Sequence, residues 1–158
     1  MKILHASPGV GKPMSEKELI NFLSKSILQL HLGTLDNKQE PNIHPVWFYY
    51  DITSNKIYFN TYKSSQKLSN INNNSGKNIY FCIDEPSFPY RGVRGKGIAL
   101  THTDTDFNLS IAMEIMKKYY GDTEHPNSKT MLEQVRLGGS IIVELTPKYF
   151  STWDYSTV

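Results

Sequence analysis

The chain reads Lys56-Ile57-Tyr58-Phe59-Asn60-Thr61-Tyr62-Lys63-Ser64-Ser65-Gln66-Lys67 across the point where a β-strand pattern passes into the start of a helix. Aromatic and β-branched residues in its first half favour a strand, and Ser65 is a good helix N-cap. The hydroxyls of Thr61 and Ser65 can donate to phosphate oxygens, and Lys67 supplies positive charge. A helix start adds unpaired backbone N–H groups and the positive end of the helix dipole. This junction therefore predicts a phosphate socket, formed by Thr61, Ser65 and Lys67.

The segments before the socket predict a helix and two more strands. A capping box at Ser15 and Glu18 begins the helix. Its apolar face follows at helical spacing: Leu19, Phe22, Leu23, Ile27 and Leu30. Strands are expected over 31–35 and 43–51, because both segments are rich in strand-forming residues and are bounded by turn residues. With the strand over 57–61 they predict an antiparallel meander.

The remaining segments, from Ser65 onward, predict three helices and three more strands. The elements are expected in this order: a helix over 65–72, strands over 79–84 and 93–100, a helix from the cap Asp106 to Gly121, a helix over 128–135, and a strand over 140–146 that Pro147 ends. Gly95 and Gly97 inside a strand indicate a bulge, a bend or a close approach to a ligand. The pattern predicts a mainly β (α+β) fold, a six-stranded antiparallel barrel with flanking helices.

Length and composition limit the domain organisation and the kind of partner. The 158 residues suit one domain, which we expect over 15–158 after a flexible N-terminal arm over 1–14. A net charge of +2 does not support binding to nucleic acid. No stretch has the length and apolarity of a membrane span or a secretory signal. The single cysteine, Cys82, excludes an intrachain disulfide and favours a reducing compartment. We therefore expect a soluble, cytoplasmic protein without membrane partners.

Taken in order, these motifs resemble the pyridoxamine-phosphate-oxidase-like superfamily of flavin-binding split β-barrels. The matching segments run in the family's order through nearly the whole chain: Leu32-Gly33-Thr34-Leu35-Asp36, Pro45-Val46-Trp47-Phe48, Ile57-Tyr58-Phe59-Asn60-Thr61 with Ser65 and Lys67, Asn70-Ile71, Tyr90-Arg91-Gly92-Val93-Arg94 with Gly97, and Ser151-Thr152-Trp153-Asp154-Tyr155. Each motif is weak alone, and the ordered set is specific. The resemblance implies a split barrel and a homodimer with a flavin at the subunit interface.

The resemblance also implies which residues bind the cofactor. Thr61, Ser65 and Lys67 match the family's phosphate-binding positions, and His44 matches a further phosphate contact on the preceding strand. The other implied cofactor-binding residues are Pro45, Val46, Trp47, Asn60, Gln66, Arg91, Val93 and Trp153. Packing in the core or a dimer interface is the alternative role for the first tryptophan, and closing the barrel end is the alternative for the second. No side chain is indicated as a catalytic group, and the histidines lack metal-ligand spacing.

Some positions depart from the relatives that oxidise pyridoxamine phosphate. Those relatives usually have arginine where this chain has His44 and Gln66, and a lysine near Tyr49. The lower charge argues against that particular activity and leaves the flavin site in place. We therefore expect an FMN-binding oxidoreductase that acts on an unidentified small molecule. An F420-dependent reductase, a non-catalytic flavin carrier or sensor, and a haem-binding relative on the same barrel are the alternatives.

Overall fold

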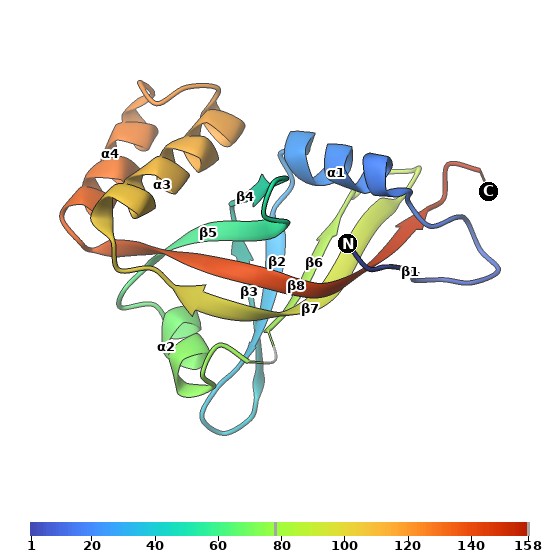
Figure 1. Cartoon of the computed structure of the whole chain (residues 1–158), viewed down its shortest axis with the longest axis horizontal. Coiled ribbons are helices and arrows are strands. Elements are labelled where there is room, and N and C mark those ends of the chain that lie inside the picture. The colour runs from blue at the N-terminus through green and yellow to red at the C-terminus, as the bar shows by residue number, and fades with distance from the viewer. Residues whose placement is uncertain (78, 158) are drawn as a thin grey trace.

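The computed structural model describes residues 1–77 and 79–157, which form a strongly curved sheet flanked by four helices (Figure 1). The helices are α1 (Glu16–Lys25), α2 (Gln66–Asn73), α3 (Thr105–Tyr120) and α4 (Pro126–Arg136). The strands are β1 (Ile3–His5), β2 (Leu30–Leu35), β3 (Pro41–Val46), β4 (Phe48–Asp51), β5 (Lys56–Tyr62), β6 (Ile79–Asp84), β7 (Arg91–Thr101) and β8 (Ser140–Asp154). The mainly antiparallel α+β class is as predicted. The predicted number of strands is wrong, because the described residues form eight strands and not six.

The order of the sheet explains how it closes into a split barrel. Its strands lie in the order β3-β2-β6-β7-β8-β5-β4, with β1 beside β8. The segment 43–51, predicted as one strand, is divided at Trp47 into β3, which pairs with β2, and β4, which pairs with β5. These two strands are consecutive in the chain and stand at opposite ends of the sheet order. The sheet must therefore curl until its two ends meet at Trp47, and the predicted meander is wrong.

The longest strand, β8, does not end at Pro147 as predicted. It continues to Asp154 and pairs with β7 along most of its length, with a register shift between Lys96 and Gly97. This shift is the irregularity that the strand glycines predict. The shift skips Lys148 of β8, directly after Pro147, so a residue without a backbone N–H is tolerated beside this bulge. A Cβ at Gly97 would lie 2.6 Å from the carbonyl oxygen of Thr146, so the close approach of the two strands requires glycine.

Two helix boundaries also differ from the prediction. The first helix ends at Lys25, so that Ile27 is 71% exposed and Leu30 instead begins β2 with its side chain in the core. The N-cap of α3 is Asp104 and not Asp106, because its carboxylate accepts the backbone N–H of Phe107 at 2.7 Å. The caps of α1 and α2 and the glycine end of α3 are as predicted.

The N-terminal segment 1–14, expected to be a flexible arm, lies partly against the sheet. Within it, β1 pairs in parallel with the end of β8, and Lys12 forms an isolated bridge with Asp154. Figure 1 shows both chain ends on this side of the molecule, away from α3 and α4. None of the helices in the described ranges has the length and apolarity needed to cross a bilayer.

Two apolar clusters hold the elements together. The larger fills the barrel and includes the buried rings of Phe48, Phe59 and Phe150. The smaller lies between the sheet and the α3–α4 pair, where Ile115 and Met116 pack against Tyr58 of β5 and its neighbours. Because α2 follows β5 directly, the end of β5 lies between α2 and the α3–α4 pair (Figure 1).

Candidate functional site

The structure brings the two hydroxyls of the predicted socket together at the β5–α2 junction. The Oγ1 atom of Thr61, near the end of β5, lies 2.8 Å from the Oγ atom of Ser65, the N-cap of α2. Ser65 accepts the backbone N–H of Leu68 at 3.4 Å, which fixes the helix start. Thr61 is 4% exposed, so its hydroxyl is held in place by the surrounding strand and helix. The junction thus presents two adjacent hydroxyls beside the free N–H groups of a helix start.

Lys67 adds a positive charge in the first turn of α2. Its side chain is half-buried, and this burial lowers the pKa of Lys67. Within residues 1–77 and 79–157, no acidic group lies within ion-pairing distance of its ammonium. A partly buried charge is costly unless it is paired. The ammonium of Lys67 is therefore available to pair with an anion.

His44 lies on β3 beside this charge and is itself half-buried. Its Nε2 atom lies 3.2 Å from the hydroxyl oxygen of Thr34 on β2. Burial and the positive charge of Lys67 both lower the pKa of His44, so the ring is neutral near pH 7 when no anion is present. Gln66 is exposed and donates to Asn70 at 2.7 Å, which directs its amide along α2.

A cavity of 290 Å³ lies next to the junction. It is lined by Gln29, Pro45, Val46, Trp47, Asn60, Thr61, Tyr62, Lys67, Ile115, Met116 and Met131. Six of these residues belong to the site that the sequence predicts, and they come from the β3–β4 break, the end of β5 and the start of α2. The sequence did not indicate the wall formed by α3 and α4. In the sequence these residues show only the apolar periodicity of a buried helix face. That periodicity does not reveal that the helices cover the end of β5.

Trp47 is a fixed wall of this cavity. Its ring stacks on that of Tyr119 at 4.7 Å between centroids with an interplanar angle of 7°, and it meets the Tyr120 ring edge-on at 5.3 Å. The Tyr119 hydroxyl donates to the carbonyl oxygen of Leu28 at 2.7 Å and accepts the backbone N–H of Phe48 at 3.3 Å. Trp47 therefore combines core packing with a position on the cavity wall.

Asn60 contributes a polar group to the same cavity. Its Nδ2 group donates to the sulfur of Met131 at 3.0 Å. Its Oδ1 atom is buried and has no hydrogen-bond partner in the part of the chain that the structure describes. A buried acceptor without a partner costs about 1–3 kcal/mol, and a ligand N–H at this position would remove that cost.

The three remaining predicted residues lie at the far end of the sheet. Arg91 pairs with Glu85 through two hydrogen bonds of 2.9 and 2.6 Å, Val93 is fully buried in the barrel core, and the ring of Trp153 lies against Gly92. The first residues of β8 adjoin the socket end of β5, and its last residues adjoin Arg91. The 15 residues of β8 span roughly 45 Å at about 3.3 Å per residue. One chain therefore does not bring these residues to the cavity.

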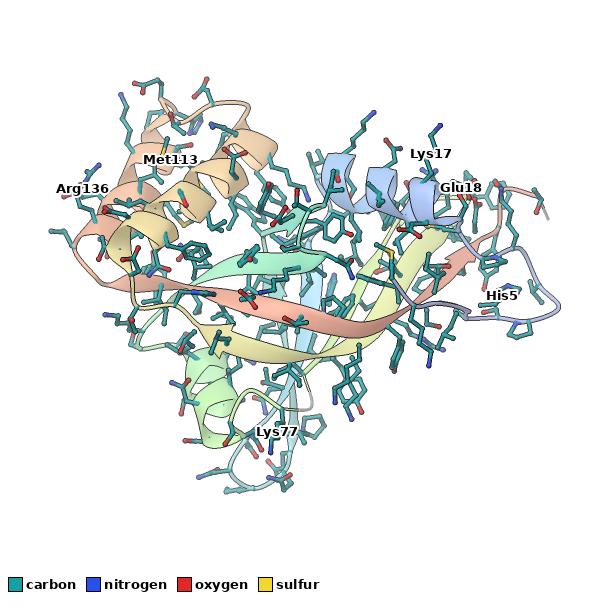
Figure 2. All side chains as sticks on the ribbon, viewed as in Figure 1. His5, Lys17, Glu18, Lys77, Met113 and Arg136 are labelled. Carbon is teal, nitrogen blue, oxygen red and sulfur yellow. The ribbon has the colours of Figure 1, made fainter. Side chains whose placement is uncertain are left out.

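Side chains at the two ends of the molecule show this separation in Figure 2. Arg136 marks the end of α4, near the start of β8, and Glu18 marks the start of α1, on the side where β8 ends. At that far end Ser15 and Lys12 lower the pKa of Glu18 to about 2 through hydrogen bonds. The charges there are already paired, unlike that of Lys67.

The family model for pyridoxamine 5'-phosphate oxidase matches residues 16–154. The chain belongs to this family. The match includes the socket, the cavity and both ends of β8, so the family assignment rests on the whole domain. A comparison with curated protein sequences found no match.

Solved structures show that the fold is shared with several proteins of low sequence identity. A conserved hypothetical protein of Mycobacterium tuberculosis, Rv2991, is 21% identical with a TM-score of 0.76, and the similarity covers 90% of this chain and 86% of that one. An F420 reductase is 22% identical with a TM-score of 0.63, covering 83% and 94% of the two chains. The haem storage protein HutZ of Vibrio cholerae is 13% identical with a TM-score of 0.65, covering 84% and 89%. At these identities the comparisons show the fold alone.

Proposed function

We propose that this protein binds FMN and is a flavin-dependent oxidoreductase that acts on a small molecule. One observation carries the proposal: Lys67 holds an unpaired charge, in the described part of the chain, beside the adjacent hydroxyls of Thr61 and Ser65. Thr61 and Lys67 also line the cavity, so a phosphate and the rest of the same ligand have neighbouring places. Membership of the pyridoxamine 5'-phosphate oxidase family supports a flavin as the class of ligand.

The donors and walls of the site fit the two parts of FMN. A phosphate suits the two hydroxyls, the ammonium of Lys67 and the N–H groups at the start of α2. A flat ring suits a cavity with Trp47 and Met116 in its wall, and the unpartnered Oδ1 of Asn60 suits the imide N–H of that ring. The cavity volume of 290 Å³ is near the lower end, about 300 Å³, of ordinary ligand sites. Part of a bound flavin would therefore extend outside this cavity.

A bound flavin supplies the two-electron redox chemistry itself. The residues of this chain bind and orient it: Lys67 and the hydroxyls anchor the phosphate, while Trp47 excludes water from one face of the cavity. Among the described residues that line the cavity, Lys67 is the titratable group with a lowered pKa, and its role here is to bind the phosphate. We therefore assign no catalytic residue. The small-molecule substrate, and the cytoplasmic location predicted from the single cysteine, stay predictions.

We further propose a homodimer formed through the outer face of β3, β6 and β7. This face carries the exposed apolar side chains of Ile43, Tyr80, Ile98 and Leu100. Ile43 and Tyr80 are both in register with Gly33 on the strand between them, which makes one continuous row across the sheet. Exposed apolar surface of this kind is typical of protein interfaces. A dimer would also allow the distant Arg91 and Trp153 end of one subunit to approach the cavity of the other.

An F420-dependent reductase is the second candidate, and the charge of the socket favours it. Lys67 is the cation beside the hydroxyls, with His44 neutral and Gln66 in place of an arginine. A single positive charge balances a phosphodiester, which carries one negative charge and is the phosphate group of F420. The same charge leaves one negative charge of the FMN dianion unbalanced. The similarity in fold to an F420 reductase agrees with this alternative.

Cofactor titrations test both candidates. The purified protein is titrated with FMN, riboflavin and F420, and binding is followed by fluorescence and by the melting temperature, which a ligand of the native state raises. We expect FMN to bind at least about tenfold more tightly than riboflavin, because riboflavin lacks the phosphate. Tighter binding of F420 than of FMN would favour the second candidate. No stabilisation by either cofactor, with a Soret band on haem addition, would refute the flavin proposal. Light scattering of the same samples measures the predicted dimer.

A further inference from the structure

A chain of polar side chains connects the socket to the interior of the protein. Gln66 donates from Nε2 to the Oδ1 atom of Asn70 at 2.7 Å, and Asn70 donates from Nδ2 to the hydroxyl oxygen of Thr34 at 2.9 Å. That oxygen lies 3.2 Å from Nε2 of His44. This series of hydrogen bonds therefore joins α2 to β2 and β3. Asn70 is 1% exposed and Thr34 is 2% exposed, so the bond between these two residues is shielded from water.

The order of donors and acceptors fixes the protonation of His44. The carbonyl oxygen of Asn70 accepts from Gln66, so its NH₂ group faces Thr34 and donates to it. The hydroxyl of Thr34 has one hydrogen of its own, and His44 is the only other side-chain partner that the described residues give it. The hydroxyl therefore donates to Nε2, which must lack a proton. A neutral ring with a bare Nε2 carries its proton on Nδ1.

The opposite arrangement is unfavourable in the free protein. A proton on Nε2 would direct two donors, from His44 and Asn70, at the same oxygen of Thr34. The hydroxyl hydrogen of this buried residue would then lack an acceptor, and an unsatisfied buried donor is costly. The ammonium of Lys67, the charged neighbour of His44 on the packed face of α2, opposes a second positive charge as well.

We infer that Asn70 and Thr34 are positioning residues that hold His44 as a neutral imidazole with its proton on Nδ1, the donor that the ring then offers to an anion in the socket. The part of this inference that concerns the cofactor phosphate rests on the proposed function. The part that concerns the ring proton describes the free protein and does not depend on that function. In relatives with an arginine at this position the charge is permanent, because arginine does not deprotonate. The polar chain instead gives this socket a neutral donor.

Nitrogen NMR of the free protein labelled on its histidines tests the inference directly, because protonated and bare ring nitrogens have well-separated shifts. At pH 7.5 we expect the His44 ring to carry its proton on Nδ1. A proton on Nε2, or a charged ring, in the wild-type protein would overturn the inference. This measurement needs neither a variant nor a cofactor, so it decides the question whatever the variants do.

The variant Asn70→Asp reverses the donor and acceptor roles along this series of hydrogen bonds, with almost no change in the size of the side chain. A carboxylate accepts on both oxygens, so Thr34 would donate to it and accept from His44, and the ring proton would move to Nε2. Asn73→Asp is the matched control, because it adds the same charge at an exposed position of α2. We expect the change of ring nitrogen in the first variant and not in the second. The same His44 signals in both variants and the wild type would contradict the role of Asn70.

Measurements with FMN and riboflavin test whether the protonation of His44 affects binding of the cofactor. FMN should shift the His44 signals of the wild-type protein, and riboflavin, which lacks the phosphate, should not. Asn70→Asp should weaken FMN binding by about tenfold or more relative to riboflavin, against less than about threefold for Asn73→Asp. Equal binding of FMN and riboflavin by the wild type would refute the proposed function while the proton position of the free protein still stands. An Nδ1–H ring whose signals FMN leaves unmoved would instead refute the role of His44 as a phosphate donor.

Discussion

Replacing Lys67 with methionine should weaken FMN binding and leave riboflavin binding unchanged. The ammonium of Lys67 is half-buried and has no acidic partner in the described ranges, so its interaction energy is available to a phosphate. A charge-assisted hydrogen bond contributes about 1.5–3 kcal/mol. With about 1.4 kcal/mol for each factor of ten, the expected loss of FMN affinity is roughly 10-fold to 150-fold. Riboflavin shares the ring and lacks the phosphate, so the ratio of the two dissociation constants isolates the socket.

The variant should fold at least as well as the wild type. Methionine keeps the length of the lysine stem and removes a charge that burial already disfavours. The melting temperature of the free protein should therefore stay the same or rise. Fluorescence titrations of both flavins, at the same pH and salt concentration, then measure binding without a correction for unfolded protein.

Lys63→Met is the matched control for this experiment. Lys63 is an exposed lysine of the same junction, and its ammonium lies near Gly138 and not in the cavity. Its loss removes the same formal charge, which solvent and salt screen, so FMN affinity should change less than about threefold. The argument is refuted if Lys67→Met weakens both flavins equally, or if the two lysine variants weaken FMN to the same extent.

Three further predictions concern charge and pH. Burial lowers the pKa of Lys118 to about 7, and the unfolded chain keeps a lysine pKa of about 10.4, so the unfolded state binds more protons between these values. The free energy of unfolding should therefore rise with pH across that window, by at most about 1.4 kcal/mol per pH unit, and urea denaturation should show a flatter slope for Lys118→Met. The pKa of His44 is lowered in the free protein, and a bound phosphate dianion raises it. FMN affinity should therefore fall as the pH rises from the pKa of the free protein to that of the complex. A titration series in which the affinities for FMN and riboflavin change in parallel with pH would contradict this. Gln66→Arg should strengthen FMN binding by about tenfold, measured by the same fluorescence titration, with riboflavin unaffected.

Local sequence signals predicted the β5–α2 junction well. Thr61, Ser65 and Lys67 fall at a strand end, an N-cap and a first helical turn, and each of these positions depends on neighbours within a few residues. The strand over 79–84 and the end of α3 at Gly121 were also correct, because a turn and a left-handed glycine mark them locally. Signals of this kind need no knowledge of the rest of the fold.

The errors occurred where distant segments decide the structure. The apolar run 43–51 reads as one strand, and only the need of β3 and β4 to pair with opposite ends of the sheet divides it at Trp47. Pro147 ends a strand in isolation, but a bulge at the next residue of β8, Lys148, lets the pairing with β7 continue past it. The wall of Ile115, Met116 and Met131 gives no local sign of its position, because helix periodicity indicates that a face is buried and not what it covers.

Distant parts of the structure also decide which predicted cofactor-binding residues can meet, because a single chain holds two groups of them apart. The resemblance to the family implies Arg91 and Trp153 as cofactor-binding residues along with Thr61 and Lys67, but the length of β8 separates the two groups. Curling the sheet joins its ends at Trp47, and it does not shorten the distance along a strand. If both groups contact one flavin, they must therefore come from different subunits, and the exposed row that includes Ile43 and Tyr80 is the surface through which we propose that the subunits meet. The proposed dimer and the complete cofactor site are thus a single hypothesis, and a monomer that binds FMN tightly would require the Arg91 end to be left out of the site.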